Sequence, residues 1–139
     1  MKSTSKNWKN FMNNQYHCEI SSEIFDLFYS HEQIGKEDIN FYIDQAKKVN
    51  PKTILELGAG TGRVMLPLAE QGYQIDGIEL SLDCVNKLAR KLSEKNITNA
   101  KIIYGDMLKN IPEKKYDLII CPFRGLQHLY SIKIKIDFF

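Results

Sequence analysis

The sequence predicts an α/β fold built around a parallel β-sheet, and three observations lead to this prediction. Short apolar segments alternate with amphipathic segments of helical length, which is the pattern of βαβ units. Glycine or acidic residues follow the apolar segments directly, as expected where ligands approach such a sheet. The composition is that of one globular domain, with 139 residues, 43% of them hydrophobic and 26% charged. Collagen-like, disordered and coiled-coil chains are therefore excluded.

The chain divides into an N-terminal helical cap (residues 1–50), a sheet-forming part (51–130) and an atypical tail (131–139). In the cap, Lys36 to Val49 predicts a helix, because its apolar residues recur every three or four positions. Asn50-Pro51 ends this helix, since proline cannot continue it.

Four strands are expected after the cap, at Thr53–Leu57, Tyr73–Leu80, Ala100–Tyr104 and Tyr116–Cys121. A glycine run and a helix that extends to Ala69 separate the first two strands. Ser81 is expected to cap a second helix, whose apolar face continues to Leu92. Pro122 ends the fourth strand.

The glycine run that follows the first strand, Gly58 to Gly62, is the most informative feature of the sequence. Glycines without Cβ atoms let a ligand lie against bare backbone. Dinucleotide-binding proteins space their glycines as G-x-G-x-x-G, but here the third glycine comes one residue early and Arg63 takes its place. This spacing argues against a dinucleotide-dependent oxidoreductase.

The ordered set of motifs resembles the class I S-adenosylmethionine-dependent methyltransferases, whose first motif has the form E-x-G-x-G-x-G. The segment Glu56-Leu57-Gly58-Ala59-Gly60-Thr61-Gly62 fits this form, and Gly77–Ser81 and Gly105–Met107 follow it in the order found in the family. The resemblance runs from about Phe25 to Leu129. It implies S-adenosyl-L-methionine as cofactor and a partial Rossmann-like sheet with the strand order 3-2-1-4.

The resemblance implies a role for residues at each strand end. Glu79 would accept hydrogen bonds from both ribose hydroxyls. Asp106 would contact the adenine amino group beside the backbone of Met107, although Gly-Asp also forms plain turns. Leu80 would pack on the adenine face, or would be a core residue.

The methionine end of the cofactor would meet Glu56 and the glycine backbone, because its amino group is positively charged. Arg63 and Tyr29 are candidates for its carboxylate, and the alternative for Arg63 is a solvent-facing arginine. The expected cofactor-binding set is Tyr29, Glu56, Gly58, Ala59, Gly60, Gly62, Arg63, Glu79, Leu80, Asp106, Met107 and Cys121.

The methyl acceptor is expected to be a small molecule. Relatives that methylate amino groups of bases or glutamine carry [DN]-P-P-[YF] after the fourth strand, whereas this chain has Cys121-Pro122-Phe123-Arg124. A net charge of +2 also argues against a nucleic-acid partner. His128 is the candidate catalytic base, and its alternative is a structural histidine.

The tail, residues 131–139, departs from the family, because isoleucine and lysine alternate there with the period of a strand. It is either a genuine edge strand or the product of a truncated or frameshifted gene, and the second explanation is favoured. The family's fifth to seventh strands are absent from the pattern. The fourth strand would then be an exposed apolar edge, and self-association through that edge, or a partner that supplies the missing surface, is expected.

The sequence contains no pattern typical of a metal site, a disulfide framework or a membrane span. Cys18, Cys84 and Cys121 are widely spaced and form no CxxC pair, so neither a metal site nor a disulfide framework is expected. No apolar stretch approaches the ~18 residues of a membrane span, and a cytoplasmic protein without a membrane partner is expected. The rival functions are a non-catalytic cofactor-binding fragment and, less favoured, the oxidoreductase.

Overall fold

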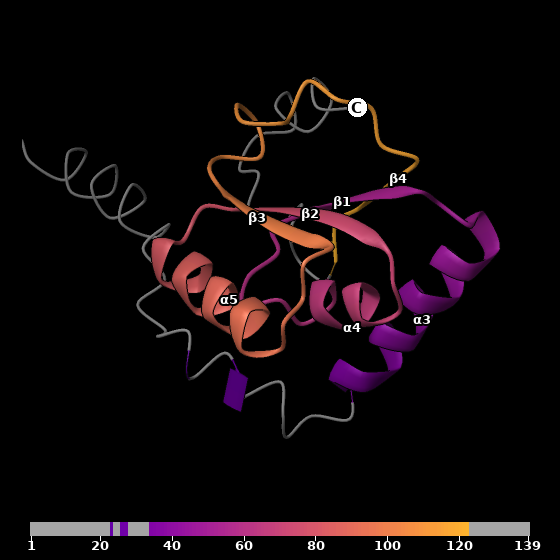
Figure 1. The fold of residues 1–139 in the computed structure, drawn as a ribbon, viewed down its shortest axis with the longest axis horizontal. Helices are drawn as coiled ribbons and strands as arrows, with labels where there is room; N and C mark the ends of the chain where they lie inside the picture. Colours follow the sequence, from indigo (N-terminus) through magenta and orange to yellow (C-terminus); the bar gives the residue numbers. More distant parts are fainter. Residues whose placement is uncertain (1–22, 24–25, 28–33, 123–139) are drawn as a thin grey trace, which may run out of the picture.

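The computed structural model describes residues 23, 26–27 and 34–122 (Figure 1). Helix α3 (Ile34–Val49) precedes four strands and two helices: β1 (Thr53–Leu57), α4 (Met65–Glu70), β2 (Gln74–Glu79), α5 (Leu82–Glu94), β3 (Ala100–Tyr104) and β4 (Leu118–Ile120). All strand pairs are parallel, and the strands lie in the order β3-β2-β1-β4. The predicted fold class and strand order are confirmed.

Helix α3 ends where the sequence predicts, because Asn50 adopts a left-handed φ of 51° and Pro51 follows it. Its Ala46 is fully buried, and Ile39, Tyr42 and Ile43 pack against the same core. The apolar spacing of this helix therefore reflects contact with the sheet domain. The division of the chain at residues 50 and 130 stays a prediction.

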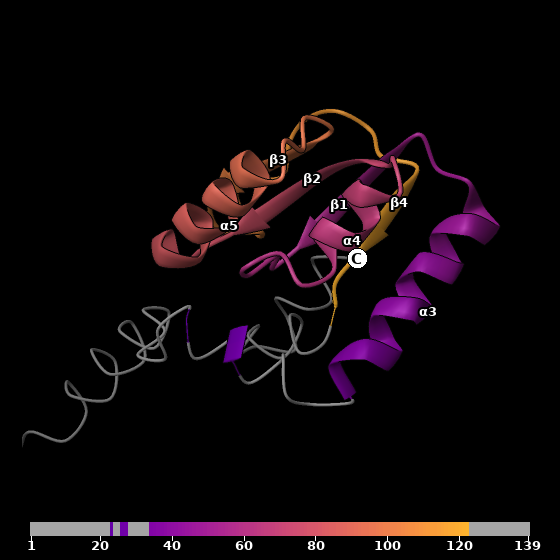
Figure 2. The same ribbon diagram turned by 60° about the horizontal axis from the view of Figure 1, so that its bottom comes forward.

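Helices α4 and α5 cover one face of the sheet, and α3 lies beside α4 (Figures 1 and 2). Helix α5 begins with the predicted cap, in which the Ser81 hydroxyl accepts a hydrogen bond from Cys84 N. It ends at Glu94, and Asn96 shortly after has a left-handed φ of 53°. Buried residues of these helices, among them Met65 and Leu88, form the main core with Ile54 and Ile75 of the central strands.

The opposite face of the sheet carries a second core of Leu55, Leu57 and Ile78. In the described part of the chain, the connection between β3 and β4 crosses this face (Figure 1). Tyr116 of the connection packs against the second core and donates a hydrogen bond of 2.7 Å to Asp76 Oδ2 of β2. Burial and this contact with a carboxylate raise the pKa of the Tyr116 hydroxyl.

Strand β4 is shorter than the predicted Tyr116–Cys121 segment. Among the described residues it pairs with β1 alone, so one of its edges has no neighbour. Ile120 is buried, but Ile119 is 56% exposed and does not show the two-sided burial of a central strand. The predicted tail strand lies outside the described residues. In the part of the chain that the structure covers, no helix has the length and apolar character needed to cross a bilayer.

Candidate functional site

The unusual residues meet at the carboxyl ends of the strands. Gly58 N and Ala59 N, just after β1, both donate to Ile78 O of β2, at 2.9 and 3.0 Å. Gly105 N, just after β3, donates to Glu79 O at 3.0 Å. Because all four strands are parallel, the glycine run, Glu79 and the Gly105-Asp106 turn lie along one edge of the sheet.

The glycine run, which we call the glycine loop (residues 58–62), needs glycine for two different reasons. Gly58, Gly60 and Gly62 have positive φ angles of 71°, 55° and 90°. A Cβ on Gly62 would lie 2.4 Å from Leu88 Cδ1, so this glycine lets the loop pack on α5. A Cβ on Gly60 would meet nothing within 4 Å, so this residue faces open space. Gly60 is therefore the point where a ligand can approach the backbone.

Glu79 links the glycine loop to the start of α5. Its Oε2 accepts a hydrogen bond from Gly60 N, and its Oε1 accepts one from Ser81 N, both at 2.8 Å. A carboxylate offers about four acceptor positions, so these two bonds orient the group and leave capacity for donors of a ligand. The predicted acid at the tip of the second strand therefore has a fixed position.

Glu56 is 2% exposed in the central strand β1, and its Oε2 has no hydrogen-bond partner among the described residues. Burial raises the pKa of this carboxyl to about 8. The charge of Arg63 opposes this rise, and the charges of Glu79 and Asp38 add to it. An unpaired buried carboxyl is costly, and a cationic donor would satisfy it.

Arg63 lies in contact with α3 and does not face solvent freely. Its guanidinium forms a two-pronged ion pair with Asp38, in which Nη2 lies 2.8 Å from Oδ2 and Nη1 contacts Oδ1. The side chain of Arg63 is 16% exposed. The carboxylate that pairs with Arg63 in the structure is thus that of Asp38. The expected contact of Arg63 with a ligand carboxylate stays a prediction.

Asp106 organises the turn after β3. Its Oδ1 accepts from Leu108 N at 2.9 Å, and its own amide donates to Asn110 Oδ1 at 2.7 Å. These are the contacts of the plain turn that the sequence left open as an alternative. Its role toward adenine stays a prediction.

The remaining expected residues fall into two groups. Met107 and Cys121 pack against the second core, and Leu80 is half-buried just after Glu79. Tyr29 and His128 lie outside the described residues. Among the residues that the structure describes, no three or more His, Cys, Asp or Glu side chains gather in an arrangement that could hold a metal ion.

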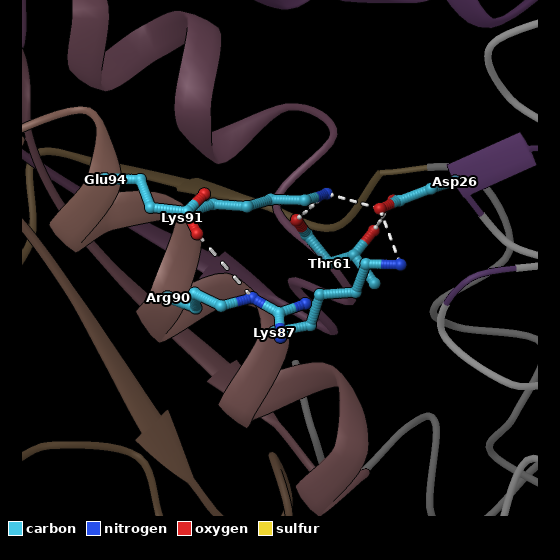
Figure 3. A network of polar contacts seen from close by, with 6 residues as sticks. All are labelled: Asp26, Thr61, Lys87, Arg90, Lys91 and Glu94. Carbon is cyan, nitrogen blue, oxygen red and sulfur yellow. Dashed lines mark hydrogen bonds and ion pairs between the residues drawn. The ribbon is translucent and has the colours of Figure 1, made fainter.

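Sequence reasoning missed two acidic residues that contact the glycine loop region. Asp38 binds Arg63, and Asp26 accepts a 2.6 Å hydrogen bond from the Thr61 hydroxyl (Figure 3). Each lies 25 or more positions from its partner. No local spacing signals such contacts. Gly77 was also missed as a packing residue, although a Cβ there would lie 2.8 Å from Ala59 Cβ.

Comparison with known sequences identifies relatives of the chain. It is 31% identical over 87 residues to a probable ribosomal RNA small subunit methyltransferase A of Methanosphaera stadtmanae, a match that covers 63% of this chain and 32% of that protein. It is 25% identical over 95 residues to (S)-tetrahydroprotoberberine N-methyltransferase of Eschscholzia californica, with 67% of this chain and 27% of that protein covered. The chain thus spans about a third of the length of these curated relatives.

Solved structures and a family model agree with these relatives. The CcbJ methyltransferase from Streptomyces caelestis is similar, with a TM-score of 0.72 and 27% identity over 88% of this chain and 49% of CcbJ. A family model described as a methyltransferase domain matches residues 54–135, more than half of the chain. The chain therefore belongs to the methyltransferase domain family and has the Rossmann-like α/β fold.

Proposed function

We propose that this chain binds S-adenosylmethionine at the carboxyl ends of its strands and belongs to an enzyme that methylates a small molecule. The proposal rests on Oε2 of buried Glu56, which has no hydrogen-bond partner within the described part of the chain. An acceptor of this kind beside a glycine loop suits a ligand with a positively charged amino group. The methionine part of S-adenosylmethionine has such a group.

The other residues fit the remaining parts of the cofactor. Gly60 leaves open space where the ligand would lie against the loop. Glu79 keeps acceptor capacity for the two ribose hydroxyls, which is chemistry that a carboxylate performs well. Asp106 and the Met107 backbone would take the adenine end, since both follow β3 at the same sheet edge.

The cofactor supplies a methyl group on a sulfonium, which is already a good leaving group. The chain therefore has to hold the acceptor in line with that methyl group, and proximity supplies most of the rate enhancement. A base is needed only for an acceptor that is protonated at the working pH, and His128 is our candidate for it.

A small-molecule acceptor is favoured by two features of the sequence. The net charge is +2, and Cys121-Pro122 stands where an Asp or Asn would hold the amino group of a base. The second candidate is an RNA acceptor, which the similarity to a probable ribosomal RNA methyltransferase favours. Incubating the chain with labelled S-adenosylmethionine and either RNA or a panel of small amines and phenols distinguishes these acceptors.

Calorimetric titration with S-adenosylmethionine, S-adenosylhomocysteine and NAD tests the cofactor assignment. We expect the first two to bind and NAD to bind at least tenfold more weakly. Preference for NAD would favour the dinucleotide-dependent oxidoreductase. Binding of S-adenosylmethionine without methyl transfer to any acceptor would favour the non-catalytic cofactor-binding fragment.

A further inference from the structure

Asp26 connects three parts of the molecule through one carboxylate (Figure 3). Its Oδ1 accepts a hydrogen bond of 2.6 Å from the Thr61 hydroxyl of the glycine loop. Its Oδ2 lies 2.7 Å from Lys91 Nζ and 3.0 Å from Lys87 Nζ, both on α5. Lys91 Nζ also donates to the Thr61 backbone oxygen at 3.1 Å.

We infer that Asp26 is a positioning residue for the cofactor, because it fixes Thr61 and thereby the glycine loop. This inference rests on the proposed function. Thr61 is 6% exposed and stands between Gly60 and Gly62, two glycines in left-handed conformations. Glycines leave a loop conformationally free, so neighbouring contacts have to hold it in one shape. Asp26 binds the hydroxyl of Thr61, and Lys91 binds its backbone carbonyl.

The charges explain why an acid at this point matters to the loop. The side chains of Lys87 and Lys91 are 13% and 26% exposed, and they stand one helical turn apart. The burial of Asp26 favours its neutral form, but hydrogen bonds with Lys91, Thr61 and Lys87 outweigh this effect and lower its pKa. Without this carboxylate, two partly buried cations would repel each other beside the Thr61 carbonyl.

The alternative is an ion pair that contributes to stability alone. The chain contains a more exposed carboxylate–lysine pair for comparison, since Glu70 accepts from Lys95, the residue directly after α5, at 2.6 Å. Glu70 ends α4 and contacts no residue of the glycine loop through this pair. Replacing Glu70 therefore removes a carboxylate–lysine pair at the end of α5 and leaves the loop contacts intact.

The test is a double-mutant cycle read as the dissociation constant of S-adenosylhomocysteine. Asp26→Ala and Thr61→Val should each weaken binding by about tenfold, which is the upper range for one hydrogen bond. The double variant should bind no more weakly than the weaker-binding single variant, because both substitutions break the same contact. Glu70→Ala should leave the dissociation constant unchanged. All titrations are made at a temperature at which circular dichroism shows each variant to be folded.

Hydrogen exchange on the ligand-free proteins gives a second readout. Amides of the glycine loop should exchange faster in Asp26→Ala than in the wild type, and no faster in Glu70→Ala. If Asp26→Ala does not fold, Thr61→Val carries the test, because it breaks the same hydrogen bond and leaves the carboxylate of Asp26 beside Lys87 and Lys91. Wild-type affinity in Asp26→Ala, or additive losses in the double variant, would overturn the inference. Failure of the wild type to bind S-adenosylhomocysteine would instead overturn the proposed function, and unchanged loop exchange would then still reject the role of Asp26.

Discussion

Glu56 is a buried carboxyl whose ionisation is unfavourable in the folded protein. Its pKa rises from an ordinary value of 4.5 to about 8, first because burial disfavours the charged form. Between these two pH values the folded chain keeps a proton on Glu56 that the unfolded chain has lost. The free energy of unfolding should therefore fall as the pH rises from about 5 to about 8.

The pH dependence of stability tests this property. Glu56→Gln removes the titrating group, so the variant should lose less stability than the wild type between pH 5 and pH 8. The difference should grow by at most about 1.4 kcal/mol for each pH unit in that window. Urea unfolding of both proteins at three pH values measures it. Parallel stability curves would show that Glu56 is ionised in the folded protein at neutral pH.

In the proposed site, the same carboxyl should couple binding of the cofactor to the release of a proton. A cationic amino group beside Glu56 favours the ionised form, so binding at pH 7 should release a proton from the protein. Calorimetry with S-adenosylhomocysteine in two buffers of different ionisation enthalpy detects this release. We expect buffer-dependent enthalpies for the wild type and a smaller dependence for Glu56→Gln. Equal buffer dependence in the two proteins would mean that Glu56 does not lose a proton on binding and does not belong to the site.

Replacing Glu79 should lower the affinity for the cofactor. Glu79→Ala removes the proposed acceptor for the ribose hydroxyls and the two hydrogen bonds that join Gly60 to Ser81. Binding of S-adenosylhomocysteine should weaken by ~1.5–3 kcal/mol, the range for hydrogen bonds to a charged group. Calorimetry measures the loss. Glu94→Ala is the control, because Glu94 is 66% exposed and pairs only loosely with Arg90 at 3.9 Å. Equal affinities of Glu79→Ala and the wild type would mean that the site lies elsewhere.

At the scale of elements, two effects of replacing a glycine in the glycine loop can be distinguished: backbone strain and loss of contact with the ligand. Gly60 and Gly72 both have a positive φ, of 55° and 93°, and a Cβ on either would meet nothing within 4 Å. Alanine at either position should cost about 1–2 kcal/mol of stability through backbone strain alone. Only Gly60→Ala should also weaken binding of S-adenosylhomocysteine, because only Gly60 faces the proposed ligand.

Chemical unfolding and calorimetry on this pair of variants provide the comparison. The Gly72→Ala protein serves as the matched control for strain, since Gly72 follows the end of α4 and lies outside the glycine loop. An equal effect of both variants on affinity would mean that strain, and not contact with the ligand, explains any loss.

The sequence was sufficient to predict elements whose signal is local. Strand Thr53–Leu57 and the Ser81 cap appear as predicted, because an apolar run and a capping hydroxyl act over a few residues. Contacts of Asp26 and Asp38 could not be predicted, because they join a partly buried acid to a residue far along the chain. Ile119 is exposed on β4, which lies at the end of the strand order among the described residues. An apolar strand looks the same in sequence at the centre and at the edge.

At the scale of the whole molecule, behaviour in solution should depend on the edge of β4 that has no neighbour among the described residues. Ile119 is 56% exposed and pairs in register with Leu55 of the second core. An apolar residue on a strand without a second neighbour in the described chain favours association with another strand. We therefore expect the protein to self-associate.

Size-exclusion chromatography with light scattering over a dilution series measures this association. The mass should exceed that of a monomer at high concentration and fall on dilution. Ile119→Lys should shift the equilibrium toward the monomer, because a charged residue at a strand edge opposes pairing. Ile111→Lys, which alters a 45% exposed isoleucine in the connection before β4, should change it little. A monodisperse wild-type monomer at every concentration would contradict this prediction.

The central claim is that S-adenosylmethionine binds along one edge of the sheet, at the ends of β1, β2 and β3. Backbone amide chemical shifts, recorded by NMR while S-adenosylhomocysteine is added, test this claim most directly. The largest changes should fall in residues 58–63, 79–82 and 105–107, which are far apart in the sequence and adjacent at that edge. Changes centred on α3 or on the C-terminal end of α5, or no changes at saturating ligand, would contradict it.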